Sequence, residues 1–308
     1  MSENTEQVII IGSGPAGLTA GIYTSRSAMK PLLFTGSEIG GQVNLTMEVE
    51  NYPGFPDGIT GPELVQRMQK QAERFGCRVI VDTVTEVKLD EHPFVVKTQS
   101  GREHRCKALI ITTGANPRRL GVPGEKELTG RGVSYCATCD GFFFRGKEVA
   151  VVGGGDAAIE EAIFLTRYVN KVRVIHRRDQ LRADKILADR LIATPNVEVV
   201  WDTIVKRVVG DELGVKAVDV HNKKTGEDST FNVDGFFIFI GLVPNNNWIK
   251  DAVACADDGF ILTDENLHTD IPGVFAAGDV RHKEFRQITT AVSDGAMAAR
   301  GAENYLQE

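Results

Sequence analysis

Two segments of this 308-residue chain share one order: a short apolar strand, a glycine-rich turn and a helix. The first runs from the strand Gln7–Ile11 through Gly12–Gly17, and the second from Lys147–Val152 through Gly153–Ala158. In G-x-G-x-x-G/A the first glycine allows a tight turn, the second lets backbone approach a pyrophosphate, and the third position lets the helix pack on the strand. The repeat therefore predicts an α/β protein with two Rossmann-like dinucleotide-binding domains of related topology.

The second domain is predicted to be inserted into the first. Ile271–Asp279 has the pattern of a strand, a turn and the start of a helix without a new glycine fingerprint, so it completes the first domain. The chain then crosses between domains near Asn116-Pro117 and near Val243-Pro244, and two crossings make a double hinge. We predict a discontinuous first domain, residues 1–116 and 246–308, and an inserted domain, residues 117–245.

Local signals add three more elements to the first domain. Thr60 followed by Gly61-Pro62-Glu63 has the pattern of a helix start, with a threonine cap and an early proline, and predicts a helix to about Phe75. Alternating segments at Thr83–Lys97 and Arg105–Thr112 predict a meander that returns to the sheet.

Composition excludes several classes of protein. The net charge of −7 provides no basic footprint for nucleic acid. The first seven residues are polar without a signal-peptide pattern, and no stretch approaches the roughly 20 apolar residues of a membrane span. Five cysteines, three of them isolated, do not resemble a secreted disulfide framework. We expect a cytoplasmic protein that binds neither nucleic acid nor membrane.

A basic cluster follows the second strand of the inserted domain. Where an NAD site would place an acid, the chain has His176-Arg177-Arg178 and then Arg182. Guanidinium groups bind a doubly charged 2′-phosphate through charge-assisted hydrogen bonds. The alternative is a solvated basic loop, but the position at a strand end favours NADP(H); which arginine dominates stays open.

The first domain departs from the fingerprint at its ribose-binding position. Its second predicted strand, Pro31–Thr35, ends without an acid, and the nearest one is Glu38. Contact with a cofactor ribose therefore falls either to Glu38 or to backbone groups, and the sequence does not choose between them.

Cys136 and Cys139 lie three positions apart, directly before the second glycine turn. This spacing suits a disulfide and tends to lower the pKa of one thiol. A zinc site would need a second ligand pair, but Cys77, Cys106 and Cys255 are isolated and no histidine has ligand spacing, so no metal is expected. Buried inert cysteines are the other alternative; the spacing favours a redox pair.

Asp140 follows the pair directly and allows two interpretations. It is either a charge near a helix N-terminus or an acid–base group that protonates a leaving thiolate. The second interpretation is favoured because thiol–disulfide exchange requires such a proton.

Together these motifs resemble the low-molecular-weight thioredoxin reductases. The resemblance rests on Gly12–Gly17, Gly40-Gly41-Gln42, Cys136–Gly141, Gly153–Ala158, His176-Arg177-Arg178, and Gly278-Asp279 with Arg286-Gln287, and extends from Val8 to about Tyr305. It implies a homodimer that reduces thioredoxin with NADPH through FAD and the cysteine pair, with FAD in the discontinuous domain and NADPH in the inserted one.

The resemblance also assigns residues by position. For FAD these are Gly12, Ser13, Gly14, Pro15, Ala16, Gly17, Glu38, Gly40, Gly41, Gln42, Asn51, Gly278, Asp279, Arg286, Gln287 and Ile288. For NADPH they are Gly153, Gly154, Gly155, Asp156, Ala157, Ala158, His176, Arg177, Arg178 and Arg182. The catalytic residues are Cys136, Cys139 and Asp140, with Cys139 nearer the flavin by resemblance; which thiol attacks thioredoxin stays open.

Two departures from the usual family pattern stand out. Asp156-Ala157 replaces a more usual Asn-Thr pair, and Gly241 lacks the polar residue that often follows it. The segment Glu48–Gly54 resembles a family loop and is either a flavin-side loop or a structural turn. Because nicotinamide and dithiol must both reach the flavin, the resemblance implies that one domain rotates between half-reactions. Reduction of a peroxiredoxin or glutaredoxin-like protein, and a non-catalytic flavin redox sensor, are the alternative functions.

Overall fold

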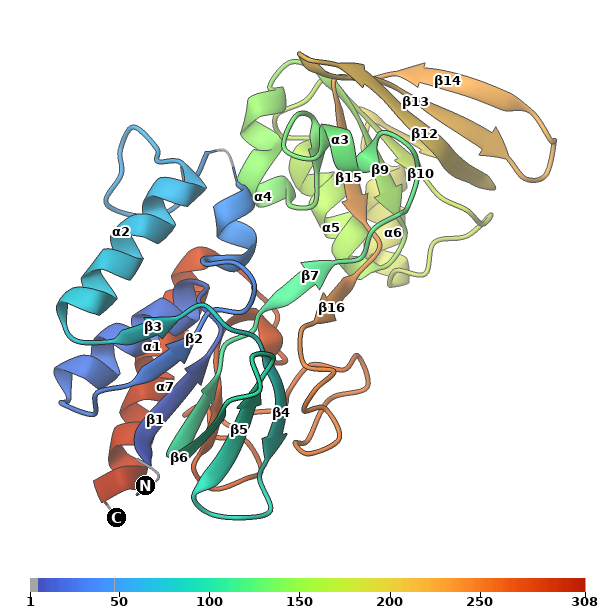
Figure 1. Cartoon of the computed structure of the whole chain (residues 1–308). Coiled ribbons are helices and arrows are strands. Elements are labelled where there is room, and N and C mark those ends of the chain that lie inside the picture. The colour runs from blue at the N-terminus through green and yellow to red at the C-terminus, as the bar shows by residue number, and fades with distance from the viewer. Residues whose placement is uncertain (1–4, 47, 308) are drawn as a thin grey trace. The chain divides into compact units, whose positions relative to one another are not determined.

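Both predicted glycine-turn units are present in the computed structural model, which describes residues 5–46 and 48–307. The chain divides into a first unit, residues 1–116 with 243–308, and a second unit, residues 117–242. The second unit is thus inserted into the first, as the sequence predicts (Figure 1), but it ends at Leu242, three residues before the predicted end at Asn245. The elements of the first unit are β1 (Glu6–Ile11), α1 (Pro15–Arg26), β2 (Leu32–Phe34), the 3-10 helix η1 (Gly41–Leu45), α2 (Gly61–Arg74), β3 (Arg78–Ile80), β4 (Val84–Lys88), β5 (Phe94–Thr98), β6 (Glu103–Ile111), β17 (Val274–Ala276), η3 (Gly278–Val280) and α7 (Ile288–Gln307).

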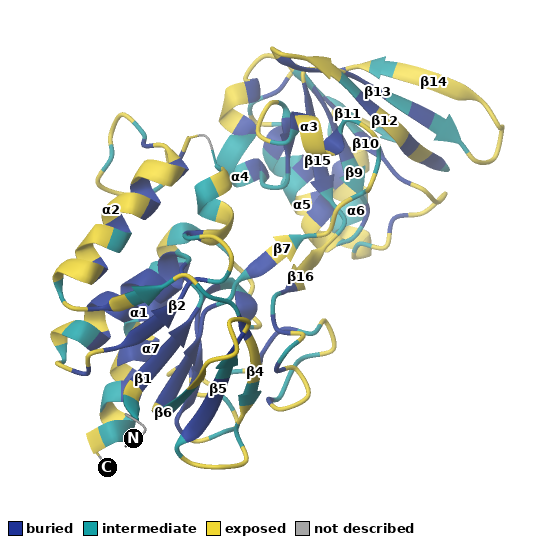
Figure 2. Cartoon of the chain, in the orientation of Figure 1, coloured by how far each residue is buried: buried dark blue, intermediate teal, exposed yellow. Residues whose placement is uncertain are grey.

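Strand β1 lies inside the sheet of the first unit. It pairs in parallel with β2 and β6, so that Ile10 lies opposite Leu33 on one side and Ile110 on the other. The described residues form a seven-stranded sheet of order β3-β2-β1-β6-β5-β4, with β17 also parallel to β6. Because successive side chains point to opposite faces, Val8 and Ile10 pack in the core that includes α1 and α7, whereas Ile9 packs on the other face. Figure 2 shows β1 and β6 buried along most of their length.

The local predictions for this unit are largely confirmed. The Thr60 hydroxyl caps α2 by accepting a hydrogen bond from the Glu63 amide at 3.3 Å. Strands β4, β5 and β6 form an antiparallel meander, as predicted. One detail differs: after β17 the chain does not enter a helix at Asp279 but forms the short 3-10 helix η3, and α7 begins only at Ile288.

The second unit contains a five-stranded parallel sheet and a separate antiparallel sheet among its described residues. The parallel sheet has the order β11-β10-β9-β15-β8, with β9 and β10 joined by the glycine turn and α5. The antiparallel sheet β12-β13-β14 was not predicted. The elements of the second unit are α3 (Glu125–Leu128), β8 (Val133–Ser134), α4 (Ala137–Asp140), the 3-10 helix η2 (Gly141–Phe144), β9 (Glu148–Gly153), α5 (Asp156–Leu165), β10 (Lys171–Ile175), α6 (Lys185–Ile192), β11 (Val197–Val200), β12 (Thr203–Asp211), β13 (Gly214–Asn222), β14 (Asp228–Asn232) and β15 (Gly235–Phe239).

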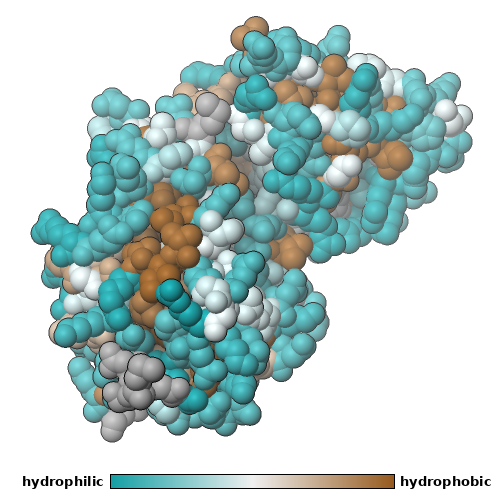
Figure 3. All heavy atoms as spheres, in the orientation of Figure 1, coloured by the Kyte–Doolittle hydropathy of each residue, from teal (hydrophilic) through white to brown (hydrophobic). Residues whose placement is uncertain are grey.

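Two short strands carry the chain between the units, β7 (Ala115–Pro117) and β16 (Leu242–Pro244), and they pair with each other. The Asn245 amide donates to the Gly114 carbonyl at 2.9 Å, and the Arg118 amide donates to the Gly241 carbonyl at 2.9 Å. The face seen in Figure 3 is mainly hydrophilic, with its largest apolar area over the first unit. No helix within the described residues has the length and apolar character needed to span a membrane.

Candidate active site

The glycine turn after β1 is constrained from inside the protein at two of its three glycines. Gly12 has φ +111°, and a Cβ there would lie 2.6 Å from the Thr112 carbonyl carbon. A Cβ at Gly17 would overlap the Gly12 carbonyl oxygen and lie 2.6 Å from Thr112 Oγ1. These two positions therefore require glycine because helix α1 packs tightly against β1 and β6.

No contact inside the protein requires glycine at the middle position, Gly14. A Cβ at Gly14 would meet nothing within 4 Å. Gly14 is the N-cap residue of α1, no side chain caps its amides, and Pro15 follows it. Helix N-termini with free amides bind phosphate groups, so this open cradle fits the pyrophosphate of a dinucleotide cofactor.

The two glycines should therefore respond differently to alanine. Gly14→Ala adds a methyl group where backbone must approach the pyrophosphate, and losing one charged hydrogen bond (about 1.5–3 kcal/mol) weakens FAD binding roughly tenfold or more. Gly17→Ala introduces a clash with backbone and should prevent normal folding. Circular dichroism and FAD titration of the two proteins check this. Equal FAD affinity in Gly14→Ala and wild type would contradict the assigned cradle.

Ser13 ties this turn to the segment after β2. Its buried hydroxyl donates to the Thr35 carbonyl at 3.3 Å and accepts from the Gly40 amide at 3.1 Å. Glu38 is exposed beside an open cavity of about 490 Å³, which Ser37, Gln66 and Val81 also line. An exposed carboxylate beside an open cavity can accept hydrogen bonds from ribose hydroxyls, the role that the sequence leaves to either Glu38 or backbone groups.

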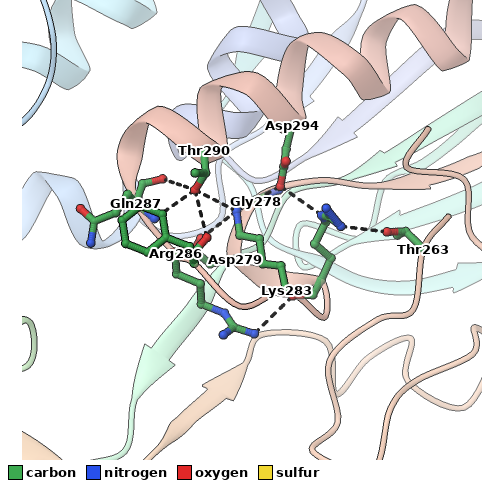
Figure 4. A network of polar contacts seen from close by, with 10 residues as sticks. Thr263, Gly278, Asp279, Lys283, Arg286, Gln287, Thr290 and Asp294 are labelled. Carbon is green, nitrogen blue, oxygen red and sulfur yellow. Dashed lines mark hydrogen bonds and ion pairs between the residues drawn. The ribbon is translucent and has the colours of Figure 1, made fainter. Parts of the chain in front are cut away.

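Asp294, on α7, is the centre of a polar network at the carboxyl end of β17 (Figure 4). Its buried Oδ2 accepts hydrogen bonds from the Gly278 amide at 3.0 Å and from Arg281 Nε and Lys283 Nζ, both at 3.1 Å. The Lys283 side chain is only 9% exposed, and its ammonium also lies 3.5 Å from Asp279 Oδ1. The network links α7, η3 and the predicted cofactor residue Asp279.

Asp279 itself keeps unused hydrogen-bonding capacity. Its Oδ1 is buried without a hydrogen bond among the described residues, since Lys283 lies at ion-pair distance but not in hydrogen-bond geometry. Burial raises the pKa of Asp279, and the Lys283 and Arg286 cations oppose this rise. A buried acceptor without a donor is unusual, and a ribityl hydroxyl of FAD would satisfy it.

Lys283→Met should test this network. It leaves two carboxylates without their shared cation, and breaking a buried ion pair from one side costs about 3–5 kcal/mol. The pKa of Asp279, which burial already raises, then rises further in the folded state because Lys283 no longer opposes the effect of burial. Because the folded protein then binds protons more tightly than the unfolded chain, the loss of stability should be larger at about pH 8 than at about pH 5.

Urea unfolding of the variant at both pH values measures this effect. Lys88→Met is the matched control, because Lys88 is exposed on strand β4 of the same unit. This variant should change the free energy of unfolding little. A loss of stability that did not depend on pH would contradict the proposed role of the charge.

Other predicted cofactor residues of the first unit also come together. Asn51 Nδ2 donates to Gln287 Oε1 at 3.1 Å, which joins the Glu48–Gly54 segment to the residue before α7. The Arg286 guanidinium lies over the Phe260 ring, with its carbon 4.1 Å from the centroid. Burial lowers the pKa of Arg286, and its Nε has no hydrogen bond among the described residues. Gln42 Nε2 donates to Asn116 Oδ1 at 2.7 Å.

His176 follows β10 and lies beside the second glycine turn, with a backbone carbonyl close to each ring nitrogen. The buried ring lies 2.8 Å from the Gly153 carbonyl through Nδ1 and 2.9 Å from the Gln180 carbonyl through Nε2. A Cβ at Gly154 would overlap this ring. The structure therefore gives His176 the role of holding the turn in shape.

The three arginines near this turn remain exposed. Arg177, Arg178 and Arg182 form no ion pair within the part of the chain that the structure describes. The Arg182 amide donates to the Gly154 carbonyl at 2.7 Å, which fixes its backbone at the turn. Gly155 caps α5 without a side-chain partner, as Gly14 caps α1. The turn thus presents free amides beside a cluster of guanidinium groups, a set that fits a dinucleotide with a 2′-phosphate.

Cys136 and Cys139 form a disulfide across helix α4, with their Cα atoms 5.3 Å apart. Cys136 is the N-cap residue, and its Sγ accepts a hydrogen bond from the Cys139 amide at 3.2 Å. The Ser134 hydroxyl lies 3.1 Å from the Cys136 amide and 3.2 Å from its carbonyl oxygen. The prediction of a redox pair fits this geometry better than two inert thiols.

Two acidic side chains lie near the cysteine pair, Asp140 in α4 itself and Glu161 on α5. Burial raises the pKa of Asp140, while a hydrogen bond from the Ser134 hydroxyl lowers it. On α5, Glu161 Oε2 accepts a hydrogen bond from the Ala137 amide at 2.8 Å. No group of three or more potential metal ligands occurs among residues 5–46 and 48–307.

Four of these residues were not predicted: Ser134, Glu161, Lys283 and Asp294. None belongs to a glycine or cysteine motif, and each acts through a neighbour. Only Asp294 leaves a trace in the sequence, as an acid on the otherwise small-residue face of a long helix.

Comparison with known proteins gives a consistent picture. A family model described as pyridine nucleotide-disulphide oxidoreductase matches residues 6–295. The chain is 47% identical to the thioredoxin reductase of Rickettsia prowazekii over 307 residues, covering 99% of each. It superposes on the thioredoxin reductase of Streptococcus pyogenes with a TM-score of 0.94, 46% identity and 99% coverage of both chains. Its superposition on Lactococcus lactis thioredoxin reductase in the FR conformation gives a TM-score of 0.67. The two chains are 45% identical, and the match covers 98% of this chain and 99% of that one.

Proposed function

Because the chain belongs to the thioredoxin reductases of the pyridine nucleotide-disulphide oxidoreductase family, we propose that Cys136 and Cys139 are the dithiol through which it reduces thioredoxin. FAD and NADPH are the cofactors of this enzyme family. The net reaction converts NADPH, a proton and a protein disulfide into NADP⁺ and a protein dithiol. The observation that carries the assignment is the Cys136–Cys139 disulfide, placed between the two glycine cradles in the sequence.

Each unit has the residues for one cofactor. In the first unit the Gly14 cradle, Glu38 and the unsatisfied Asp279 oxygen would hold FAD. In the second unit Gly155 and the exposed arginines would hold NADPH. FAD, when bound, supplies the step that converts hydride transfer into two-electron transfer to a disulfide. The domain assignment, residues 1–116 and 246–308 for FAD and 117–245 for NADPH, is part of this proposal.

Within the dithiol, we assign the attack on thioredoxin to Cys136. Its Sγ already accepts the Cys139 amide hydrogen at 3.2 Å and lies 3.3 Å from Thr138 Oγ1. Donors at a sulfur stabilise its thiolate, which is the nucleophile in exchange. The Cys136 thiolate then attacks one sulfur of thioredoxin, and Cys139 resolves the mixed disulfide, which restores the Cys136–Cys139 bond and releases reduced thioredoxin.

Asp140 is the proposed proton donor and acceptor. Opening the Cys136–Cys139 disulfide releases a thiolate that needs a proton. Because burial raises the pKa of Asp140, its carboxyl holds a proton closer to neutral pH than an exposed aspartate does. The interpretation of Asp140 as an acid–base group is therefore preferred over that of a helix charge.

Rotation of one unit on the two linkers would let the dithiol meet flavin and thioredoxin in turn. Two solved relatives of nearly equal identity to this chain have TM-scores of 0.94 and 0.67 against it, so those relatives differ from each other in arrangement. The linkers are confined to β7 and β16. We also propose the homodimer implied by the family and a cytoplasmic location.

The function is tested by mixing the protein with NADPH and oxidised thioredoxin from the same organism. Thioredoxin thiols should form with NADPH and much more slowly with NADH. A protein that bound FAD but did not reduce thioredoxin, while reducing a peroxiredoxin or glutaredoxin-like protein, would overturn the choice of partner. Absence of turnover with every disulfide would point to a sensor instead.

A further inference from the structure

The turn that carries the cysteine pair is held by a carboxylate on a neighbouring helix. Glu161, one of two adjacent glutamates in α5, accepts a hydrogen bond from the Ala137 amide at 2.8 Å. Burial raises the pKa of the Glu161 carboxyl, and the Ala137 and Thr138 amides of this turn oppose that rise. Both amides belong to the first turn of α4, directly after Cys136. Glu161 therefore occupies a donor that lies beside the reactive sulfur.

Beside the two donor groups at Cys136 Sγ, this arrangement adds an acid, which most activated cysteines do not have. Reactive thiolates are commonly stabilised by free amides at a helix N-terminus or by a nearby Lys, Arg or His. Here a carboxylate accepts the Ala137 amide, whereas Cys136 Sγ accepts the Cys139 amide and lies 3.3 Å from the Thr138 hydroxyl. The helices that pack most closely against α4 among the described residues are α5 and η2. Their sequences and that of α4 contain no Lys, Arg or His, but they contain four acids: Asp140, Asp156, Glu160 and Glu161.

We propose that Glu161 is a positioning residue of the redox site, which holds the Cys136–Cys139 turn through its amides and opposes negative charge on the sulfurs, so that the dithiol is a strong reductant. The inference rests on the proposed role of this pair. The step concerned is disulfide plus two electrons and two protons giving dithiol, with the electrons supplied by NADPH. A thiolate stabilised in the reduced form makes a dithiol a weaker reductant. By opposing negative charge on the sulfurs, Glu161 would keep the dithiol a strong reductant.

The charge and the hydrogen bond of Glu161 can be separated by substitution. Glu161→Gln keeps an oxygen that accepts the Ala137 amide and removes only the charge. Glu160→Gln, the exposed neighbour on the same helix, is the matched control. The flavin-loaded proteins are reduced with NADPH without oxygen, alkylated with iodoacetamide over a range of pH, and analysed by mass spectrometry at Cys136.

The alkylation midpoint of Cys136 should fall by about one pH unit in Glu161→Gln, the effect expected from removing a nearby like charge. Glu160→Gln should change it much less. Above both midpoints, the equilibrium constant for reducing thioredoxin should fall about tenfold for a one-unit shift, because the reduced form is stabilised by the same free energy.

An unchanged midpoint in Glu161→Gln, or an equal shift in Glu160→Gln, would overturn the proposal. If Glu161→Gln failed to fold, Glu161→Asp would retain the charge at a greater distance and should shift the midpoint in the same direction by less. If the alkylation midpoint shifted as expected but the equilibrium constant for reducing thioredoxin did not change, the choice of thioredoxin as partner would be wrong. The two results can be told apart because the alkylation profile does not depend on thioredoxin.

Discussion

Replacing Cys139 with serine should lower the rate at which NADPH reduces thioredoxin by at least about 1,000-fold, the scale on which removing an essential reactive group acts. A hydroxyl cannot form the Cys136–Cys139 bond, so the enzyme loses the carrier that accepts two electrons and passes them on. Electron transfer from NADPH to ferricyanide should continue, since a small acceptor does not need the dithiol. Steady-state rates with the two acceptors measure the difference.

Cys255→Ser is the matched control, because Cys255 is a free cysteine of the first unit. Its rate with thioredoxin should stay close to that of wild type. If Cys139→Ser retained substantial thioredoxin reduction, electrons would reach thioredoxin by another route, and the role of the pair would be wrong.

The second large effect is expected at the arginines of the second unit. Arg177→Ala combined with Arg178→Ala should lower kcat/KM for NADPH by about 10- to 150-fold for each hydrogen bond lost, because a hydrogen bond to a charged phosphate contributes about 1.5–3 kcal/mol. NADH has no 2′-phosphate, so its kcat/KM should change little. The preference for NADPH over NADH would then largely disappear.

Arg190→Ala, at an exposed position in the last turn of α6, provides the control for loss of positive charge in the same unit. It should leave the cofactor preference unchanged. Equal losses for NADPH and NADH in the double variant would show that the arginines support the fold or the general charge of the unit rather than the 2′-phosphate.

Motifs built from backbone geometry were predictable from the sequence. Gly12 requires glycine locally because its φ is +111°, and Gly17 because a Cβ would meet the Gly12 carbonyl oxygen, although Thr112 also crowds both positions. Such local requirements leave a fixed spacing in the sequence. The same holds for the Thr60 cap and for the cysteine spacing. The inserted arrangement followed from counting these units along the chain.

Contacts between distant segments were not predictable in this way. Asp294 meets Gly278 and Lys283 only because α7 packs over β17, and Glu161 meets Ala137 only because α5 packs against α4. His176 has the same origin: its motif indicated phosphate binding, but the fold buries the ring between two carbonyl groups. The sheet β12-β13-β14 was missed because nothing in the two glycine motifs implies it.

The central claim is that electrons from NADPH reach thioredoxin only through Cys136 and Cys139. The most direct test is to treat the flavin-loaded protein with NADPH in the absence of oxygen, alkylate its thiols and identify them by mass spectrometry. Both cysteines should be labelled in the protein treated with NADPH, and neither in the untreated protein. The labelling should disappear when an excess of oxidised thioredoxin is added after NADPH and before the alkylating reagent. Thioredoxin that became reduced while Cys136 and Cys139 stayed joined throughout would contradict the account.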